Sequence, residues 1–169
     1  MNLIVAEIKS CKKHPEATKL NICEVFDGTN TLQVVCGATN VRSGMRTILA
    51  PVGATTPKGL LIKEAVLRGV TSNGMLCSAK DIDVSNEDGI IDLPESVKIG
   101  SSLSSISTNL LSSTPWHKFT VVDSIWENRQ TKKLLVTRQA DDLPSEKEFR
   151  LLSQTFFENN QYIYRHFKV

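Results

Sequence analysis

Short apolar stretches separated by turn residues run through the first eighty residues, and none has the length or period of an amphipathic helix. An Asp27-Gly28 pair between two of these stretches predicts a β-hairpin. Strands are predicted over residues 2–11, 20–26, 31–36, 46–52, 62–67 and 74–77. We expect the last two to pair with each other. About five short strands without a long helix predict a small closed β-barrel.

The pattern changes after residue 100. Residues 101–115 are rich in serine and threonine, with a few leucine and isoleucine residues that could pack, and we interpret most of this segment as a linker. Two apolar stretches, 119–125 and 133–137, then predict a hairpin around 127–130.

A capping box predicts a helix near the C-terminus. Ser145 and Glu148 have the spacing of a box that opens a helix, which we expect to end near Glu158. Phe149, Leu152 and Phe156 would fall on one face of it. The predicted fold is therefore mainly β: a barrel domain over 1–106, a linker over 107–115 and a small α+β extension of unknown role over 116–169.

Composition narrows the class of protein. The chain has 169 residues, 40% of them hydrophobic and 22% charged, which is typical of a globular protein. No apolar run approaches the roughly 20 residues of a membrane helix, and the N-terminus lacks the basic start of a secretory signal. We therefore expect a cytoplasmic protein.

The four cysteines are scattered. None of Cys11, Cys23, Cys36 and Cys77 forms a C-x-x-C pair, so we predict no metal site. Most lie in β-like apolar stretches, where a reduced thiol behaves as a small buried hydrophobe.

The net charge is only +2, but it is unevenly distributed. Residues 1–80 hold ten Lys and Arg against five Asp and Glu, whereas residues 81–115 hold one against six. A basic first half is typical of a protein that presents one face to a polyanion. An ordinary solvated surface could have the same excess of Lys and Arg.

The segment from Leu67 to Ser78, LRGVTSNGMLCS, carries most of the candidate chemistry. Arg68, Ser72 and Ser78 supply hydrogen-bond donors suited to phosphate and ribose, and Met75 offers an apolar surface to a base. Gly69 and Gly74 permit a positive φ or close backbone approach. On its own the segment also suits an ordinary strand–turn–strand.

Two further segments, HPEATKL at 14–20 and VCGATNV at 35–41, precede it. In this order and spacing the three segments resemble the EMAP-type tRNA-binding OB-fold domain, which occurs in the N-terminal part of the bacterial phenylalanyl-tRNA synthetase β subunit and in free-standing proteins. The stretches PKGLLIK at 57–63 and GIIDLP at 89–94 match the synthetase-β subtype. The resemblance covers roughly the first hundred residues. Thr18 and Thr39 depart from the aspartate and proline usual in the family pattern.

The resemblance implies a five-stranded OB fold that binds tRNA through strands two and three and the neighbouring loops. Residues 12–19 would form the first connecting loop. The implied RNA-binding residues are Lys12, Lys13, His14, Lys19, Asn40, Arg42, Lys58, Lys63, Arg68, Ser72, Met75 and Ser78. For His14, a hydrogen bond that pins the loop is an equally good alternative.

These features predict a non-catalytic tRNA-binding protein that recognises RNA shape and backbone and needs no cofactor. An ATP-binding motif and a Ser-His-Asp arrangement are not recognisable in the sequence. Two alternatives stay open: an assembly module, or a truncated phenylalanyl-tRNA synthetase β-type subunit without its own activity. The predicted partners are tRNA, an aminoacyl-tRNA synthetase and a second copy of the chain. Aromatic residues of the extension would supply the dimer surface: Phe149, Phe156, Phe157, Tyr162 and Tyr164.

Overall fold

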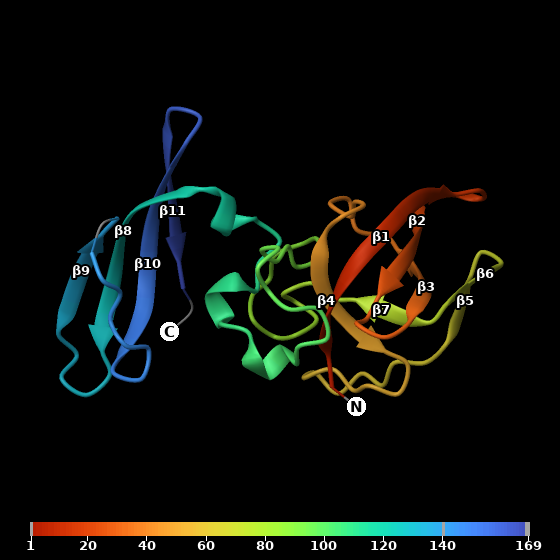
Figure 1. Ribbon diagram of the computed structural model, residues 1–169, viewed down its shortest axis with the longest axis horizontal. Helices are drawn as coiled ribbons and strands as arrows, with labels where there is room; N and C mark the ends of the chain where they lie inside the picture. The colour runs from red at the N-terminus through yellow and green to blue at the C-terminus, as the bar shows by residue number, and fades with distance from the viewer. Residues whose placement is uncertain (1, 140, 168–169) are drawn as a thin grey trace. The chain divides into compact units, whose positions relative to one another are not determined.

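The computed structural model describes residues 2–139 and 141–167, and the chain forms two compact units, Met1–Trp116 and His117–Val169 (Figure 1). The fold is mainly β, as predicted. Its described helices are three single 3-10 turns: η1 (Leu103–Ser105), η2 (Thr108–Leu110) and η3 (Trp116–Lys118).

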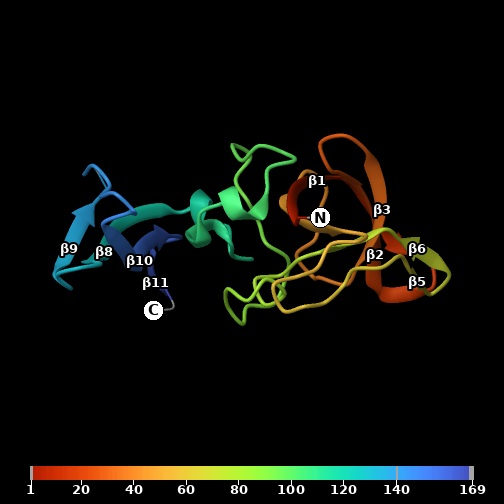
Figure 2. The ribbon, with the colours of Figure 1, turned by 90° about the horizontal axis from the view of Figure 1, so that it is seen from below.

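A five-stranded antiparallel sheet, curled into a nearly closed barrel, makes up most of the first unit (Figures 1 and 2). Its order is β3-β2-β1-β4-β7. The strands are β1 (Ile4–His14), β2 (Ala17–Phe26), β3 (Thr31–Cys36), β4 (Arg46–Pro51) and β7 (Gly74–Leu76). The prediction of a five-stranded OB-type barrel is confirmed. The Asp27-Gly28 hairpin is also present, because Phe26 pairs with Thr31 across it.

The predicted pairing of 62–67 with 74–77 is wrong. β5 (Ala65–Leu67) pairs with β6 (Val70–Ser72) in a separate two-stranded ribbon, and β7 pairs with β4 instead. Arg68 and Gly69 have φ angles of 51° and 83°, so the chain reverses immediately after β5. A two-residue turn with positive φ at both positions has the twist that antiparallel strands need. It therefore lets β5 pair with β6, the segment that follows the turn.

The barrel is closed at a seam between β3 and the β6–β7 corner. The Val35 N–H donates to Ser72 Oγ at 3.0 Å, and the Asn73 N–H donates to the Gln33 carbonyl at 2.8 Å. Gly74 at the corner lies so close to β4 that a Cβ there would be 3.0 Å from Leu49 Cδ1. These contacts bring the start of β7 against β3 and β4.

β4 is buried on both faces, which explains its apolar run Ile48, Leu49 and Ala50. Leu49 faces the cluster inside the barrel, which also holds Ile8 and Val25. Ile48 and Ala50 face a second cluster on the other side.

Residues after β7 cover that second cluster. Ile91, Leu93 and Leu111 are buried there, and the N–H of Asp92 donates to the carbonyl of Ser112 at 2.9 Å. Part of the segment interpreted from sequence as a linker thus packs on the barrel.

The second unit is a four-stranded antiparallel sheet in the order β11-β10-β8-β9. Its strands are β8 (Thr120–Asn128), β9 (Leu134–Arg138), β10 (Phe149–Glu158) and β11 (Gln161–His166). The predicted hairpin around 127–130 is confirmed by the β8–β9 pairing.

The helix predicted from Ser145 to Glu158 is wrong, so the extension is β rather than α+β. Ser145 does begin a turn, because its carbonyl accepts the N–H groups of Glu148 and Phe149 at 3.0 and 2.9 Å. The turn then gives way to β10. Asn159 and Asn160 have φ angles of 49° and 60° and form the tight turn of a β10–β11 hairpin. Pairing on both sides of β10 outweighs the local helix signal.

Candidate nucleic-acid interface

The β1–β2 hairpin carries the first group of candidate residues. The sequence predicted a loop over 12–19, but β1 runs to His14 and β2 begins at Ala17, so only Pro15 and Glu16 form the turn. Lys12 and Lys13 near the end of β1 and Lys19 on β2 are exposed. The three lysines therefore stand on paired strands, beside a shift of the β1–β2 register that follows Lys13, rather than on a long loop.

His14 fixes this hairpin tip. Its side chain is 5% exposed, and Nδ1 accepts the Glu16 N–H at 3.0 Å. Because Nδ1 is an acceptor, the ring proton lies on Nε2, which donates to the carbonyl of Leu67 at 3.0 Å. Both ring nitrogens are engaged by the protein itself. His14 is thus a pin between the hairpin and the end of β5, the structural alternative considered from sequence.

The residue after Leu67 is Arg68, in the β5–β6 turn. Its side chain is exposed, and among the residues that the structure describes it has no hydrogen bond or ion pair. Arg68 adopts a φ of 51°, which Asn or Gly would adopt at less cost. A positive φ at a non-glycine residue is the kind of backbone strain that accompanies binding sites.

These features bring together one set of cations. We call Lys12, Lys13, Lys19 and Arg68 the hairpin–turn surface. Figure 1 shows the β5–β6 ribbon beside the β1–β2 hairpin, and the His14–Leu67 hydrogen bond joins the two. Glu16 is the one acidic residue in the turn of this hairpin. The hairpin–turn surface is therefore a group of four exposed cations, three on the β1–β2 hairpin and one in the β5–β6 turn that His14 joins to it.

Asn40 and Arg42 are occupied elsewhere. The Asn40 amide donates to the carbonyl of Ile90 at 2.8 Å and accepts the Ile90 N–H at 2.9 Å. Arg42 forms two hydrogen bonds, of 2.9 and 3.3 Å, with the carboxylate of Asp92, whose side chain is 5% exposed. Both residues hold the segment after β7 against the barrel. The Asn40 amide is thus engaged within the protein, and Arg42 is paired with Asp92 although its side chain remains 44% exposed.

The remaining candidates of the Leu67–Ser78 segment also have structural contacts. Ser72 is 3% exposed and bridges Val35 and Gly74, which explains why a hydroxyl stands at the barrel seam. Ser78 Oγ donates to Asp81 Oδ2 at 2.8 Å. Met75 is half-buried against the second apolar cluster.

Lys58 and Lys63 are exposed on the connection between β4 and β5. Lys58 lies in a tight turn closed by the hydrogen bond from the Gly59 N–H to the Thr56 carbonyl. Lys63 precedes β5, at the end of the ribbon away from Arg68. Neither belongs to the hairpin–turn surface.

Four acidic residues after β7 form hydrogen bonds or ion pairs within the protein, and one of these pairs, Lys80–Asp88, is exposed. Asp88 pairs with Lys80 at 2.9 Å, and Glu87 Oε2 accepts the Ser112 hydroxyl at 2.7 Å. Asp81 and Asp92 are held by Ser78 and Arg42. The contacts of Asp81, Glu87 and Asp92 thus help to hold the segment after β7 in place.

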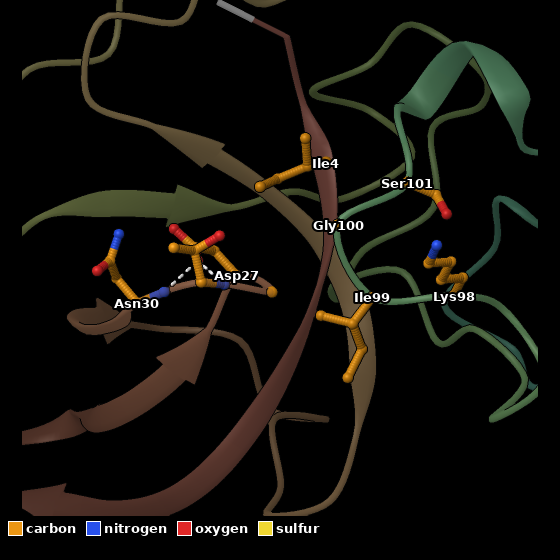
Figure 3. Close-up of a pocket in the computed structure, with 9 residues that line it drawn as sticks. Ile4, Asp27, Asn30, Lys98, Ile99, Gly100 and Ser101 are labelled. Atoms are coloured by element: carbon orange, nitrogen blue, oxygen red, sulfur yellow. Dashed lines mark hydrogen bonds between the residues drawn. The ribbon is translucent and has the colours of Figure 1, made fainter.

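A shallow pocket lies near the β2–β3 turn (Figure 3). Asp27 Oδ1 accepts the N–H groups of Thr29 and Asn30 at 2.8 and 2.7 Å, so its carboxylate caps the turn. Lys98 and Ile99 line the other side. Among the described residues there is also no group of three His, Cys, Asp or Glu side chains that could hold a metal ion.

Sequence reasoning missed the role of backbone groups at the site. The Leu67 carbonyl and the Glu16 N–H are both partners of His14, and neither gives a sequence signal because every residue carries the same backbone atoms.

Comparison with known proteins identifies relatives of the barrel unit. Residues 3–102 match a family described as "Putative tRNA binding domain". The chain is 46% identical over 106 residues to the phenylalanine–tRNA ligase beta subunit of Sulfurimonas denitrificans, covering 60% of this chain and 14% of that protein. It is 48% identical over 100 residues to the "Putative tRNA-binding protein YtpR" of Bacillus subtilis, covering 57% of this chain and 50% of YtpR. The chain thus spans half or less of the length of these relatives.

Among solved structures, a MetRS related protein from Pyrococcus horikoshii is similar with a TM-score of 0.46 and 23% identity, covering 60% of this chain and 88% of that one. No helix in the described part of the chain is long and apolar enough to cross a membrane.

Proposed function

Because this chain belongs to the family of tRNA-binding domains, we propose that it binds tRNA at the hairpin–turn surface and catalyses no reaction on it. The observation that carries the proposal is the group of four exposed cations, Lys12, Lys13, Lys19 and Arg68, on two elements joined through His14. Phosphate attraction supplies much of the affinity of such surfaces, and it is strongest where cations are concentrated and unpaired.

The proposed mode of recognition is of backbone and shape. The ammonium groups of the β1–β2 hairpin can attract phosphate oxygens, and Arg68 in the β5–β6 turn can engage a phosphate in two hydrogen bonds. The polar groups best suited to base edges, those of Asn40 and Ser72, already bond within the protein. We therefore expect little dependence on tRNA sequence.

Partners and location follow from the same proposal. The similarity to the phenylalanine–tRNA ligase beta subunit supports association with an aminoacyl-tRNA synthetase, in the cytoplasm. Self-association through the second unit is a separate proposal. It is supported by Phe157, Tyr162 and Tyr164, which are 39%, 61% and 66% exposed, whereas Phe156, which the sequence also placed at this surface, is 1% exposed. Sedimentation of the purified chain tests the proposal.

A filter-binding experiment tests the proposed function. Bulk tRNA, duplex DNA of similar length and a single-stranded oligonucleotide are compared at two salt concentrations. We expect tRNA to bind most tightly and to be released as salt rises. Equal affinity for duplex DNA, or binding that does not respond to salt, would contradict the proposal and favour an assembly module.

A further inference from the structure

Two thiols face each other across the β1–β2 hairpin. Cys11 and Cys23 are direct partners in the antiparallel register, and the Cys23 thiol donates to Cys11 Sγ at 3.6 Å. We propose that Cys11 and Cys23 are a reversible dithiol–disulfide site, which a low-molecular-weight disulfide oxidises and a small dithiol reduces. This inference concerns the hairpin itself and does not depend on tRNA binding.

The backbone geometry suits the bond. Directly opposed residues in an antiparallel pair have Cα atoms about 4.5–5.5 Å apart, and disulfides span Cα separations of about 4.4–6.8 Å. The two sulfur atoms must approach from 3.6 Å to about 2.05 Å, which rotation of the side chains can largely supply.

The other cysteines are placed less well. Cys36 on β3 lies opposite Asn21, so it is diagonal to Cys23 rather than facing it. Cys77 packs in the second apolar cluster, whereas Cys23 and Cys36 belong to the cluster inside the barrel. Cys11 is half-buried and the other three cysteines are buried. A reagent in solution therefore meets Cys11 first.

The chemistry proceeds by thiol–disulfide exchange. Cys11, as the thiolate, attacks one sulfur of the small disulfide and releases the first small thiol, which leaves a mixed disulfide on Cys11. Cys23 then loses its proton and attacks Cys11 Sγ, and the second small thiol leaves. Two protein thiols and one small disulfide thus become one protein disulfide and two small thiols.

The environment of Cys23 sets the order of these steps. Burial, and then the hydrogen bond to Cys11, raise the pKa of the Cys23 thiol well above its ordinary value, so it is protonated at neutral pH. Cys23 is therefore slow to attack a reagent. It acts as the resolving thiol once Cys11 has reacted, because the mixed disulfide is then held beside it.

The cross-link would enclose the lysine-bearing part of the hairpin. Residues 12–22 lie within the loop that the disulfide closes, and they include Lys12, Lys13, His14 and Lys19. Closing this loop removes conformations from the unfolded chain, so the oxidised form should be more stable. Opening of the hairpin should be suppressed in that form.

The full chain incubated with glutathione disulfide tests the proposal. Alkylation of free thiols followed by peptide mapping should show a Cys11–Cys23 cross-link. The melting temperature should rise by several degrees on oxidation and should fall back to that of the reduced protein when dithiothreitol is added. The matched control is Cys36→Ala, which keeps the pair and should give the same cross-link. Cys11→Ser and Cys23→Ser should each abolish the cross-link and the thermal shift.

Three outcomes would overturn the proposal. They are a stable Cys11–glutathione adduct without a cross-link, a Cys11–Cys36 cross-link, and unmodified thiols in a chain that circular dichroism shows to be folded. Because the peptide map needs no RNA, failure here is distinguishable from failure to bind tRNA.

Discussion

His14 Nε2 donates a hydrogen bond of 3.0 Å to the carbonyl oxygen of Leu67, a residue 53 positions later in the chain. The bond fixes the tip of the β1–β2 hairpin to the last residue of β5, and Arg68 follows immediately. A buried histidine thereby determines where an exposed arginine stands relative to three lysines.

Substitutions of His14 can test its two hydrogen bonds, to Glu16 and to Leu67, one at a time. His14→Ala should destabilise the protein by about 1–3 kcal/mol, because it leaves the buried polar partners of the ring unpaired. His14→Gln can place an amide N–H near the Nε2 position and should recover part of this loss, whereas His14→Asn is too short to reach Leu67. Thermal melts of the three variants check the order. A His14→Gln variant no more stable than His14→Ala would contradict a role for the Leu67 bond.

Arg68 tests the contact role of the hairpin–turn surface. Arg68→Ala should weaken tRNA binding by roughly 1–3 kcal/mol through loss of a charge-assisted contact. Arg68→Asn is the sharper variant, because asparagine suits a φ of 51° while removing the charge. We expect Arg68→Asn to melt at the wild-type temperature or slightly above it and yet to bind as weakly as Arg68→Ala. A variant that loses stability and binding in proportion would instead assign Arg68 to the fold.

The salt dependence of binding reports how many RNA phosphates the protein neutralises. With four cations engaged, log affinity should fall against log salt with a slope of about −3 to −4. Lys12→Ala and Lys19→Ala should each reduce the slope by about 1. Lys58→Ala is the matched control, because Lys58 is also exposed but lies outside the hairpin–turn surface. Titrations at four salt concentrations measure the slopes, and an equal effect of Lys58→Ala would show that the site is more diffuse.

The Arg42–Asp92 pair should matter for stability and not for binding. Asp92 is 5% exposed and Arg42 is 44% exposed, so Arg42→Ala leaves a buried carboxylate without its cation. We expect a loss of about 1–3 kcal/mol, less than for a fully buried pair because the guanidinium is partly solvated. Urea unfolding measures this loss. An unchanged stability with a smaller salt slope would assign Arg42 to the RNA contact predicted from sequence.

Truncation defines the binding unit. Residues 1–116 should fold and bind tRNA as the full chain does, because Leu111 and Ser112 contact the rest of that unit. Residues 1–106 lack the buried Leu111 side chain, worth about 1.5–3 kcal/mol, and should melt at a lower temperature. Circular dichroism and filter binding on both fragments check this. If the fragment 1–106 were as stable as 1–116, the barrel domain would end at residue 106, as the sequence predicted.

What the sequence by itself determined was local. Short apolar and β-branched stretches predicted β1 and β4, and the Asp27-Gly28 pair predicted the β2–β3 hairpin, because strand propensity and turn chemistry act between near neighbours. The family was recognisable because its motifs are contiguous, and the lysines of the hairpin could be named before their geometry was known.

What only the tertiary structure decided depends on residues far apart in the chain. The bonds of His14 to Leu67, Asn40 to Ile90 and Arg42 to Asp92 join partners 50 or more positions apart, and they separate structural polar groups from free ones. β10 is a second example of a structure that depends on distant residues. The capping box at Ser145 favoured a helix, but the segment pairs with β8 on one edge and with β11 on the other and is therefore a strand. A residue type and its neighbours state what a side chain can bind, but the folded chain decides which of its hydrogen bonds are already made.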